Sequence, residues 1–231
     1  MRFTLKIWRQ ASGQTEGSLA TYNVDNVQRT STIVEVLTDL NHALVLAQKP
    51  PIAFESDCLK GNCGACSMVI NGRPHGPGRG LAACQLPMRA FVDGATLTVE
   101  PLRARPFEVV EDLIADRGPV RRILEAGQIP STAASAASIQ SGFCIECGAC
   151  VAACRNASAS LLLGAKVLEH SRRPMPRKRV LDMVNAADEG GFGACSNDGV
   201  CEAICPKEVS LDVISALNRA FFAAAWRGPE D

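Results

Sequence analysis

Four cysteines in the first half of the chain have the spacing of a plant-type iron–sulfur centre. The run C-x4-C-x2-C is followed after 17 residues by a fourth cysteine, and the set is Cys58, Cys63, Cys66 and Cys84. This spacing is typical of a [2Fe–2S] cluster. Gly61, Gly64 and Ala65 should let the backbone wrap closely around a cluster and direct N–H groups at sulfur. Zinc is the alternative, but zinc sites usually combine two C-x2-C pairs.

A second run, C-x2-C-x2-C-x3-C, is the pattern of bacterial ferredoxins, and its members are Cys144, Cys147, Cys150 and Cys154. The fourth cysteine of such a run ligates the other cluster of a pair, so a matching run is expected downstream. Cys201-x3-Cys205-Pro206 forms the end of that run. Counting backward by the same spacing leads to Cys195 and to Asp198, where the pattern would have a cysteine.

Crossed ligation between the two runs assigns every remaining cysteine. A [4Fe–4S] cluster would take Cys144, Cys147, Cys150 and Cys205. Three thiolates are left, which suits a [3Fe–4S] cluster held by Cys154, Cys195 and Cys201. All eleven cysteines are used in this way, whereas structural cysteines would leave a remainder. Asp198 has two readings: a polar loop residue beside a three-iron cluster, which we favour, or an oxygen ligand to a fourth iron.

The composition argues against several other classes of protein. The 231 residues carry 24 basic and 24 acidic side chains, so we expect no nucleic-acid binding through bulk positive charge. Met1-Arg2 leads directly into a strand-like segment, so no export signal is expected, and metal rather than disulfides should occupy the thiols. No apolar run is long enough to span a bilayer. No nucleophile–base pair stands out, so the chemistry should belong to clusters and partners.

The first cysteine set should be positioned by a small α+β domain over residues 1–105. A capping box at Thr32–Glu35 predicts a helix with Ile33, Val36, Leu37, Leu40 and Leu44 on one face. Asn71-Gly72 predicts a hairpin turn. Strands are expected at Phe3–Trp8, Thr21–Val27, Ser67–Ile70 and, as the last one, Ala95–Glu100.

Residues 106–231 should form a second, mainly helical domain. Helices are expected within Phe107–Leu124, Cys147–Leu163, Arg179–Ala187 and Ser210–Ala225, and a loop at Ser131–Ser141. Trp8 and Trp226 are expected to pack, and His75 is expected at the surface or in a hydrogen bond. The basic stretch Arg172–Arg179 is either a solvated loop or a patch that docks on a partner or on anionic lipid.

The three motifs, in this order and over nearly the whole chain, resemble the iron–sulfur subunit of succinate dehydrogenase and fumarate reductase. The resemblance implies a β-grasp plant-type ferredoxin domain followed by an all-α bacterial-ferredoxin-like domain. It also implies an electron relay between an FAD-containing flavoprotein subunit, where succinate and fumarate interconvert, and a quinone at membrane anchor subunits that can hold haem. Such a subunit is expected to be peripheral, on the cytoplasmic side of the bacterial inner membrane.

Two departures from the family bear on the quinone. Arg155 stands where many members have proline, and Asn156–Ser160 lacks the tryptophan pair that many members carry near the quinone. Both argue against a ubiquinone site of the mitochondrial type and favour menaquinone. Succinate oxidation is the favoured activity of the complex. The alternatives are fumarate reduction, service to another flavoprotein such as a 2-hydroxyacid dehydrogenase, and a free ferredoxin-like carrier.

Overall fold

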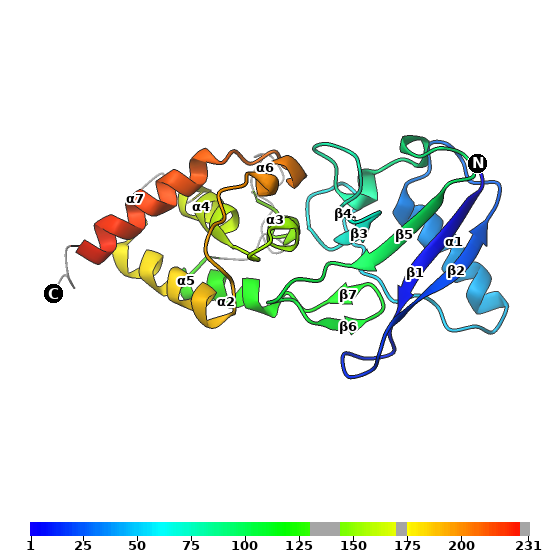
Figure 1. Ribbon diagram of the computed structural model, residues 1–231, viewed down its shortest axis with the longest axis horizontal. Coiled ribbons are helices and arrows are strands. Elements are labelled where there is room, and N and C mark those ends of the chain that lie inside the picture. The colour runs from blue at the N-terminus through cyan, green and yellow to red at the C-terminus, as the bar shows by residue number, and fades with distance from the viewer. Residues whose placement is uncertain (130–143, 170–174, 227–231) are drawn as a thin grey trace. The chain divides into compact units, whose positions relative to one another are not determined.

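The computed structural model describes residues 1–129, 144–169 and 175–226 (Figure 1). The chain divides into two compact units and passes between them more than once. The first unit comprises Met1–Arg103 and Phe107–Asp116, and the second comprises Ala104–Pro106 and the chain from Arg117 onward. The division expected at residue 105 falls within Ala104–Pro106, the first segment of the second unit.

A five-stranded mixed sheet forms the first unit, with the strand order β2-β1-β5-β3-β4. Its strands are β1 Phe3–Arg9, β2 Ser18–Val24, β3 Met68–Ile70, β4 Arg73–Pro74 and β5 Thr96–Pro101. β1 pairs parallel with β5 and antiparallel with β2, and β3 pairs antiparallel with both of its neighbours. The predicted hairpin turn is confirmed: Asn71 and Gly72 have φ values of 50° and 74°, as a type I′ turn requires.

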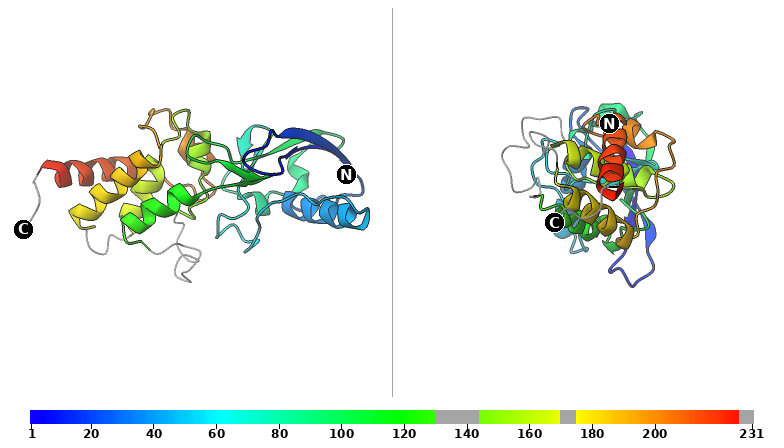
Figure 2. Two further views of the ribbon diagram at one scale, coloured as in Figure 1. Left: turned by 90° about the horizontal axis from the view of Figure 1, so that it is seen from below. Right: turned by 90° about the vertical axis from the view of Figure 1, so that its left-hand side faces the viewer.

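Helix α1, Ile33–Leu46, lies along one face of this sheet (Figure 2). The predicted capping box is present, because the Thr32 hydroxyl accepts from the Glu35 N–H at 3.3 Å and the Glu35 carboxylate accepts from the Thr32 N–H at 2.7 Å. The face packed into the core consists of Ile33, Val34, Val36, Leu37 and Leu44. Leu40, which we expected on this face, packs against the same core but is only half-buried.

The helix expected over Phe107–Leu124 is wrong for its first half, and Ala95–Glu100 is not the last strand. A two-stranded hairpin, β6 Val109–Glu111 and β7 Ile114–Ala115, precedes helix α2 Gly118–Ala126. Asp112 turns the hairpin with a φ of 43°. Its buried carboxylate accepts hydrogen bonds from the backbone N–H groups of Gln10 and Ala53. Asp112 therefore forms hydrogen bonds with residues 102 and 59 positions away in sequence, and these bonds favour the hairpin over the helix that the local pattern predicts.

The described residues of the second unit contain helices and no strand. After α2 these are α3 Ala149–Ala153, α4 Ser160–Glu169, α5 Arg177–Glu189, α6 Val200–Ile204 and α7 Asp212–Trp226. α3 packs against α6, α4 against α7, and α5 against both α2 and α7. Gly164 allows α4 and α7 to approach closely, since a Cβ there would lie 2.3 Å from the Val213 carbonyl oxygen. None of the helices described for this chain is long and apolar enough to cross a bilayer.

The two tryptophans differ in their surroundings. Trp8 packs as expected, because its ring faces the Arg103 guanidinium at 4.3 Å and its Nε1–H donates to Gln10. Trp226, at the end of α7, is 92% exposed, so the packing expected for it is wrong. The loop expected at Ser131–Ser141 and the part of the basic stretch before Met175 lie outside the described residues.

Candidate metal centres

The loop that carries the first three cysteines directs backbone N–H groups at sulfur. Lys60 and Asn62 donate to Cys58 Sγ at 3.4 and 3.2 Å, and Ala65 donates to Cys63 Sγ at 3.5 Å. The role predicted for the Ala65 N–H is therefore confirmed. Such donors stabilise negative charge on a thiolate. Burial opposes ionisation of Cys58, but the N–H groups of Asn62 and Lys60 prevail and lower the pKa of its thiol.

Glycine gives this loop its conformation. Gly61 and Gly64 adopt left-handed φ values of 68° and 71°, which L side chains rarely adopt. A Cβ on Gly61 would also lie only 2.0 Å from the Gln85 side-chain oxygen. A side chain there would have to move the Gln85 side chain, which belongs to the short 3₁₀ segment Ala83–Gln85 that carries the fourth cysteine.

Cys84 lies beside Cys66 in the interior of the first unit. The Cys84 N–H donates to Cys66 Sγ at 3.4 Å, and both residues are buried, whereas Cys58 and Cys63 are half-buried. Hydrogen bonding with Cys84 and burial raise the pKa of the Cys66 thiol. Because two neighbouring buried thiolates repel each other, ionisation of the pair calls for a compensating cation.

His75 supports the same segment and is buried, so of the two positions expected for it the surface one does not apply. Its Nδ1 accepts a hydrogen bond from the Ala83 N–H at 3.2 Å, which confirms the hydrogen-bonding reading. His75 thus stabilises the turn that presents Cys84.

The second unit contains two copies of one backbone motif. Gly148 and Gly199, with φ values of 79° and 71°, each precede a five-residue helix, α3 or α6. Two residues before each glycine, Glu146 and Asn197 respectively adopt left-handed conformations next to Cys147 and Asp198. Cys154 and Cys205 are the C-cap residues of these two helices. The two runs therefore correspond in three dimensions, and Asp198 stands where the first run has Cys147.

One pocket of the second unit brings together cysteines from both runs. Its lining includes Cys144, Cys147, Cys150 and Cys205, together with Leu161, Leu162 and Ala165 of α4. Burial and then the charges of Cys144, Cys147 and Cys205 raise the pKa of Cys150 well above its ordinary value. Burial also raises the pKa of Cys147 to about 11.

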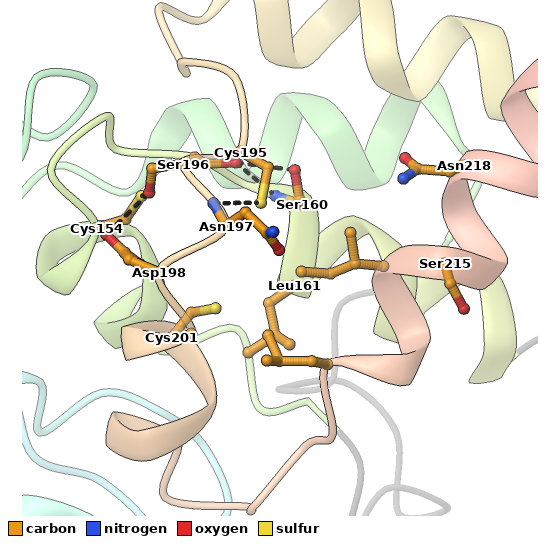
Figure 3. A pocket seen from close by; sticks show the side chains of 14 residues that line it. Cys154, Ser160, Leu161, Cys195, Ser196, Asn197, Asp198, Cys201, Ser215 and Asn218 are labelled. Carbon is orange, nitrogen blue, oxygen red and sulfur yellow. Dashed lines mark hydrogen bonds between the residues drawn. The ribbon is translucent and has the colours of Figure 1, made fainter.

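A second cavity, of about 210 Å³, is lined by Cys154, Cys195 and Cys201 (Figure 3). The segment before Cys195 reaches this place because Gly193 has no side chain: a Cβ there would lie 2.2 Å from the Asn156 carbonyl oxygen. Burial opposes ionisation of Cys154, but hydrogen bonds led by the Ser158 backbone N–H lower the pKa of its thiol. The Ser196 hydroxyl oxygen lies 3.5 Å from the Cys154 sulfur.

Asp198 also lines this cavity, but its carboxylate is occupied by local donors. Oδ2 accepts from the Ser196 hydroxyl at 3.0 Å and lies 3.6 Å from Arg155 Nε, and Oδ1 accepts from the Val200 N–H at 3.3 Å. The two residues in which the sequence departs from its patterns, Arg155 and Asp198, therefore face each other.

The chemistry of these donor sets fits iron–sulfur clusters. Crowded thiols whose ionisation is opposed by burial and by one another become stable thiolates when metal supplies positive charge. Sulfur-directed N–H groups tune such centres. Among the described residues, no three His, Cys, Asp or Glu side chains are arranged to hold a single metal ion.

Lys166 is a residue near these sites that the sequence analysis missed. It lies on α4, is buried, and pairs with Glu146, which stands between Cys144 and Cys147. The available signal was a single charge within the apolar stretch Leu161–Leu168.

Comparison with known protein families agrees with the two cysteine regions. Residues 4–122, just over half of the chain, match the family model of a 2Fe-2S iron-sulfur cluster binding domain. Residues 140–209 match that of a 4Fe-4S dicluster domain.

Similar proteins extend the match to the whole arrangement. The succinate dehydrogenase iron-sulfur subunit of Bacillus subtilis is 30% identical over 202 residues, which cover 77% of this chain and 75% of that protein. The fumarate reductase iron-sulfur subunit of Wolinella succinogenes is 31% identical over 188 residues, covering 70% and 74%. A chain of the Mycobacterium smegmatis Sdh1 complex in the apo form shares the fold, with a TM-score of 0.61 at 23% identity and 99% of both chains covered. This chain belongs to the family of iron–sulfur subunits of succinate dehydrogenase and fumarate reductase.

Proposed function

We propose that this chain relays electrons within a succinate dehydrogenase, from an FAD-containing flavoprotein subunit to a quinone at the membrane anchor. The observation that carries the proposal is the gathering of cysteines from two separate runs around two pockets of the second unit. Iron–sulfur clusters supply one-electron transfer when bound. The chain's own residues hold these groups and direct hydrogen bonds at their sulfur ligands.

The proposed ligands follow the pockets and the first loop. A [2Fe–2S] cluster would be held by Cys58, Cys63, Cys66 and Cys84. A [4Fe–4S] cluster would be held by Cys144, Cys147, Cys150 and Cys205, which line one pocket. A [3Fe–4S] cluster would be held by Cys154, Cys195 and Cys201, which line the other. The local hydrogen bonds of Asp198 support its reading as a loop residue rather than an iron ligand.

The domain types are proposed with these ligands. The mixed sheet with α1 on one face supports a β-grasp ferredoxin domain over residues 1–105. The repeated glycine-led helices α3 and α6 support a bacterial-ferredoxin-like domain over residues 106–231. The hairpin β6–β7 belongs to the second range by sequence and to the first unit by packing.

Helix α7 and the segment after Cys154 support the proposed contacts with the membrane anchor and the quinone. Phe222 and Trp226 lie one helical turn apart on α7 and are 69% and 92% exposed, which supports docking on an anchor subunit. Arg155 and the absence of aromatic residues from Asn156–Ser160 support menaquinone as the acceptor. We place the subunit at the cytoplasmic side of the bacterial inner membrane.

The test is purification of the native complex under anaerobic conditions, followed by electron paramagnetic resonance during a redox titration. We expect three distinct cluster signals, reduction of clusters by succinate, and faster electron transfer to a menaquinone analogue than to a ubiquinone analogue. Zinc at either cysteine region, or a single cluster type after careful reconstitution, would contradict the cluster assignment.

Fumarate reduction remains the second candidate, because relatives of both kinds match this chain at similar identity. The rates of succinate oxidation and fumarate reduction by the same preparation would decide between the two directions. A co-purifying flavoprotein that oxidises a 2-hydroxy acid, and not succinate, would instead place the chain with another dehydrogenase.

A further inference from the structure

A charged side chain lies in the interior of the second unit beside the four-cysteine pocket. Lys166 is 1% exposed, and its Nζ lies 2.8 Å from Glu146 Oε1, a carboxylate that is itself only 11% exposed. The same ammonium donates to the Cys144 carbonyl oxygen at 3.1 Å. The residue before it, Ala165, lines the pocket. Lys166 therefore contacts the cysteine loop at two points.

Stability alone gives a weak reason for such a pair. Buried ion pairs often stabilise a fold no more than apolar side chains of the same volume would, because both charges lose their hydration. The chain also contains an ion pair of the same 2.8 Å length, Lys178–Asp182 on α5, with side chains that are 85% and 35% exposed. Water screens that surface pair, whereas charges in the interior act more strongly on their neighbours.

The loop that Lys166 holds has an unusual backbone. Glu146 adopts a left-handed φ of 59°, which places Cys144 and Cys147 on either side of a tight bend. The contact with the Cys144 carbonyl and the ion pair with Glu146 hold this bend at two positions. The pair thus sits on the backbone between two of the four cysteines.

We propose that Lys166 and Glu146 are positioning residues that fix the Cys144–Cys147 loop, and that each charge balances the effect of the other on the reduction potential of the cluster bound there. The inference rests on the proposed [4Fe–4S] ligands. The ammonium lowers the energy of an electron added to the cluster and the carboxylate raises it, so the two charges have opposite effects on reduction. Removing the ammonium leaves a carboxylate that disfavours reduction, and removing the carboxylate leaves an ammonium that favours it.

The test compares Lys166→Met, Glu146→Gln and the double variant in the purified complex, by redox titration of the [4Fe–4S] paramagnetic signal. We expect Lys166→Met to shift the midpoint potential downward and Glu146→Gln to shift it upward. Each shift should reach at least a tenfold change in the reduction equilibrium constant, about 59 mV for one electron. The double variant should return close to the wild-type potential.

Lys178→Met is the matched control and should leave the potential of the [4Fe–4S] cluster unchanged. Within each variant, the potential of the [2Fe–2S] cluster should also stay at its wild-type value. Shifts of both single variants in the same direction, or no shift in Glu146→Gln, would overturn the inference. If Lys166→Met loses its cluster, the upward shift in Glu146→Gln decides alone. A wild-type complex without any [4Fe–4S] signal would overturn the proposed ligands and this inference together, whereas normal wild-type signals with unshifted variants would overturn the inference only.

Discussion

Replacement of Asp112 by alanine should destabilise the first unit strongly. The Asp112 carboxylate accepts from the Gln10 N–H at 2.8 Å, from the Ala53 N–H at 2.9 Å and from Arg9 Nε at 3.1 Å. Each backbone N–H left without its acceptor costs about 1–3 kcal/mol. The ion pair with Arg9, which is 21% exposed, contributes less, about 1 kcal/mol or below. These contributions are not additive, so we expect a total loss of about 3–5 kcal/mol.

A loss of this size should be visible as a lower melting temperature of the first unit. At about 4 °C per kcal/mol for a domain of this size, the midpoint should fall by about 12–20 °C. The assay is stepwise anaerobic heating of the complex, with the surviving [2Fe–2S] signal measured and the [4Fe–4S] signal as internal reference. Glu111→Ala, an exposed neighbour in the same hairpin, is the control and should change stability by less than about 0.5 kcal/mol.

The magnitude also predicts the behaviour of a milder variant, Asp112→Asn. The amide side chain would keep one oxygen acceptor but would turn an N–H donor toward the other backbone N–H, so this variant should lose about 1–3 kcal/mol. A melting temperature for Asp112→Ala within about 4 °C of the wild type, or equal loss of the [2Fe–2S] and [4Fe–4S] signals, would refute the reasoning.

Three further predictions concern the cysteine sites. Cys205→Ser should abolish the [4Fe–4S] signal first and Cys154→Ser the [3Fe–4S] signal first; damage to the clusters of their sequence neighbours instead would exclude crossed ligation. Asp198→Cys should convert the [3Fe–4S] signal to a [4Fe–4S] signal with a lower potential. Asp198→Ala should leave the [3Fe–4S] signal in place. If the wild type instead shows a [4Fe–4S] signal there and Asp198→Ala converts it to a [3Fe–4S] signal, Asp198 is an iron ligand. Gly61→Ala should reduce [2Fe–2S] occupancy, measured as iron and signal per chain, more than Gly94→Ala does, because both glycines have left-handed φ values but a Cβ would meet other atoms only at position 61.

The sequence by itself determined the local parts of this protein. Motif spacing located each cysteine run, and the turn Asn71-Gly72 and the capping box at Thr32 followed from residues only a few positions apart. The reason is that a type I′ turn, a helix N-terminus and a sulfur-directed N–H in a short loop each involve a handful of consecutive residues. The missing cysteine at position 198 was visible for the same reason, since the spacing of one run predicts the spacing of its repeat.

Only the tertiary structure decided features that depend on distant partners. Asp112 turns a hairpin where the local pattern favoured a helix, because its carboxylate binds donors at the end of β1 and in the segment before the first cysteine loop. His75 is buried and Trp226 exposed, although residue type favoured the opposite for each. The ion pair of Lys166 joins residues from two separate segments, and the lone charge in an apolar stretch does not by itself identify Glu146 as its partner. Burial is fixed by what packs against a side chain, so it becomes known only when the chain has brought those neighbours together.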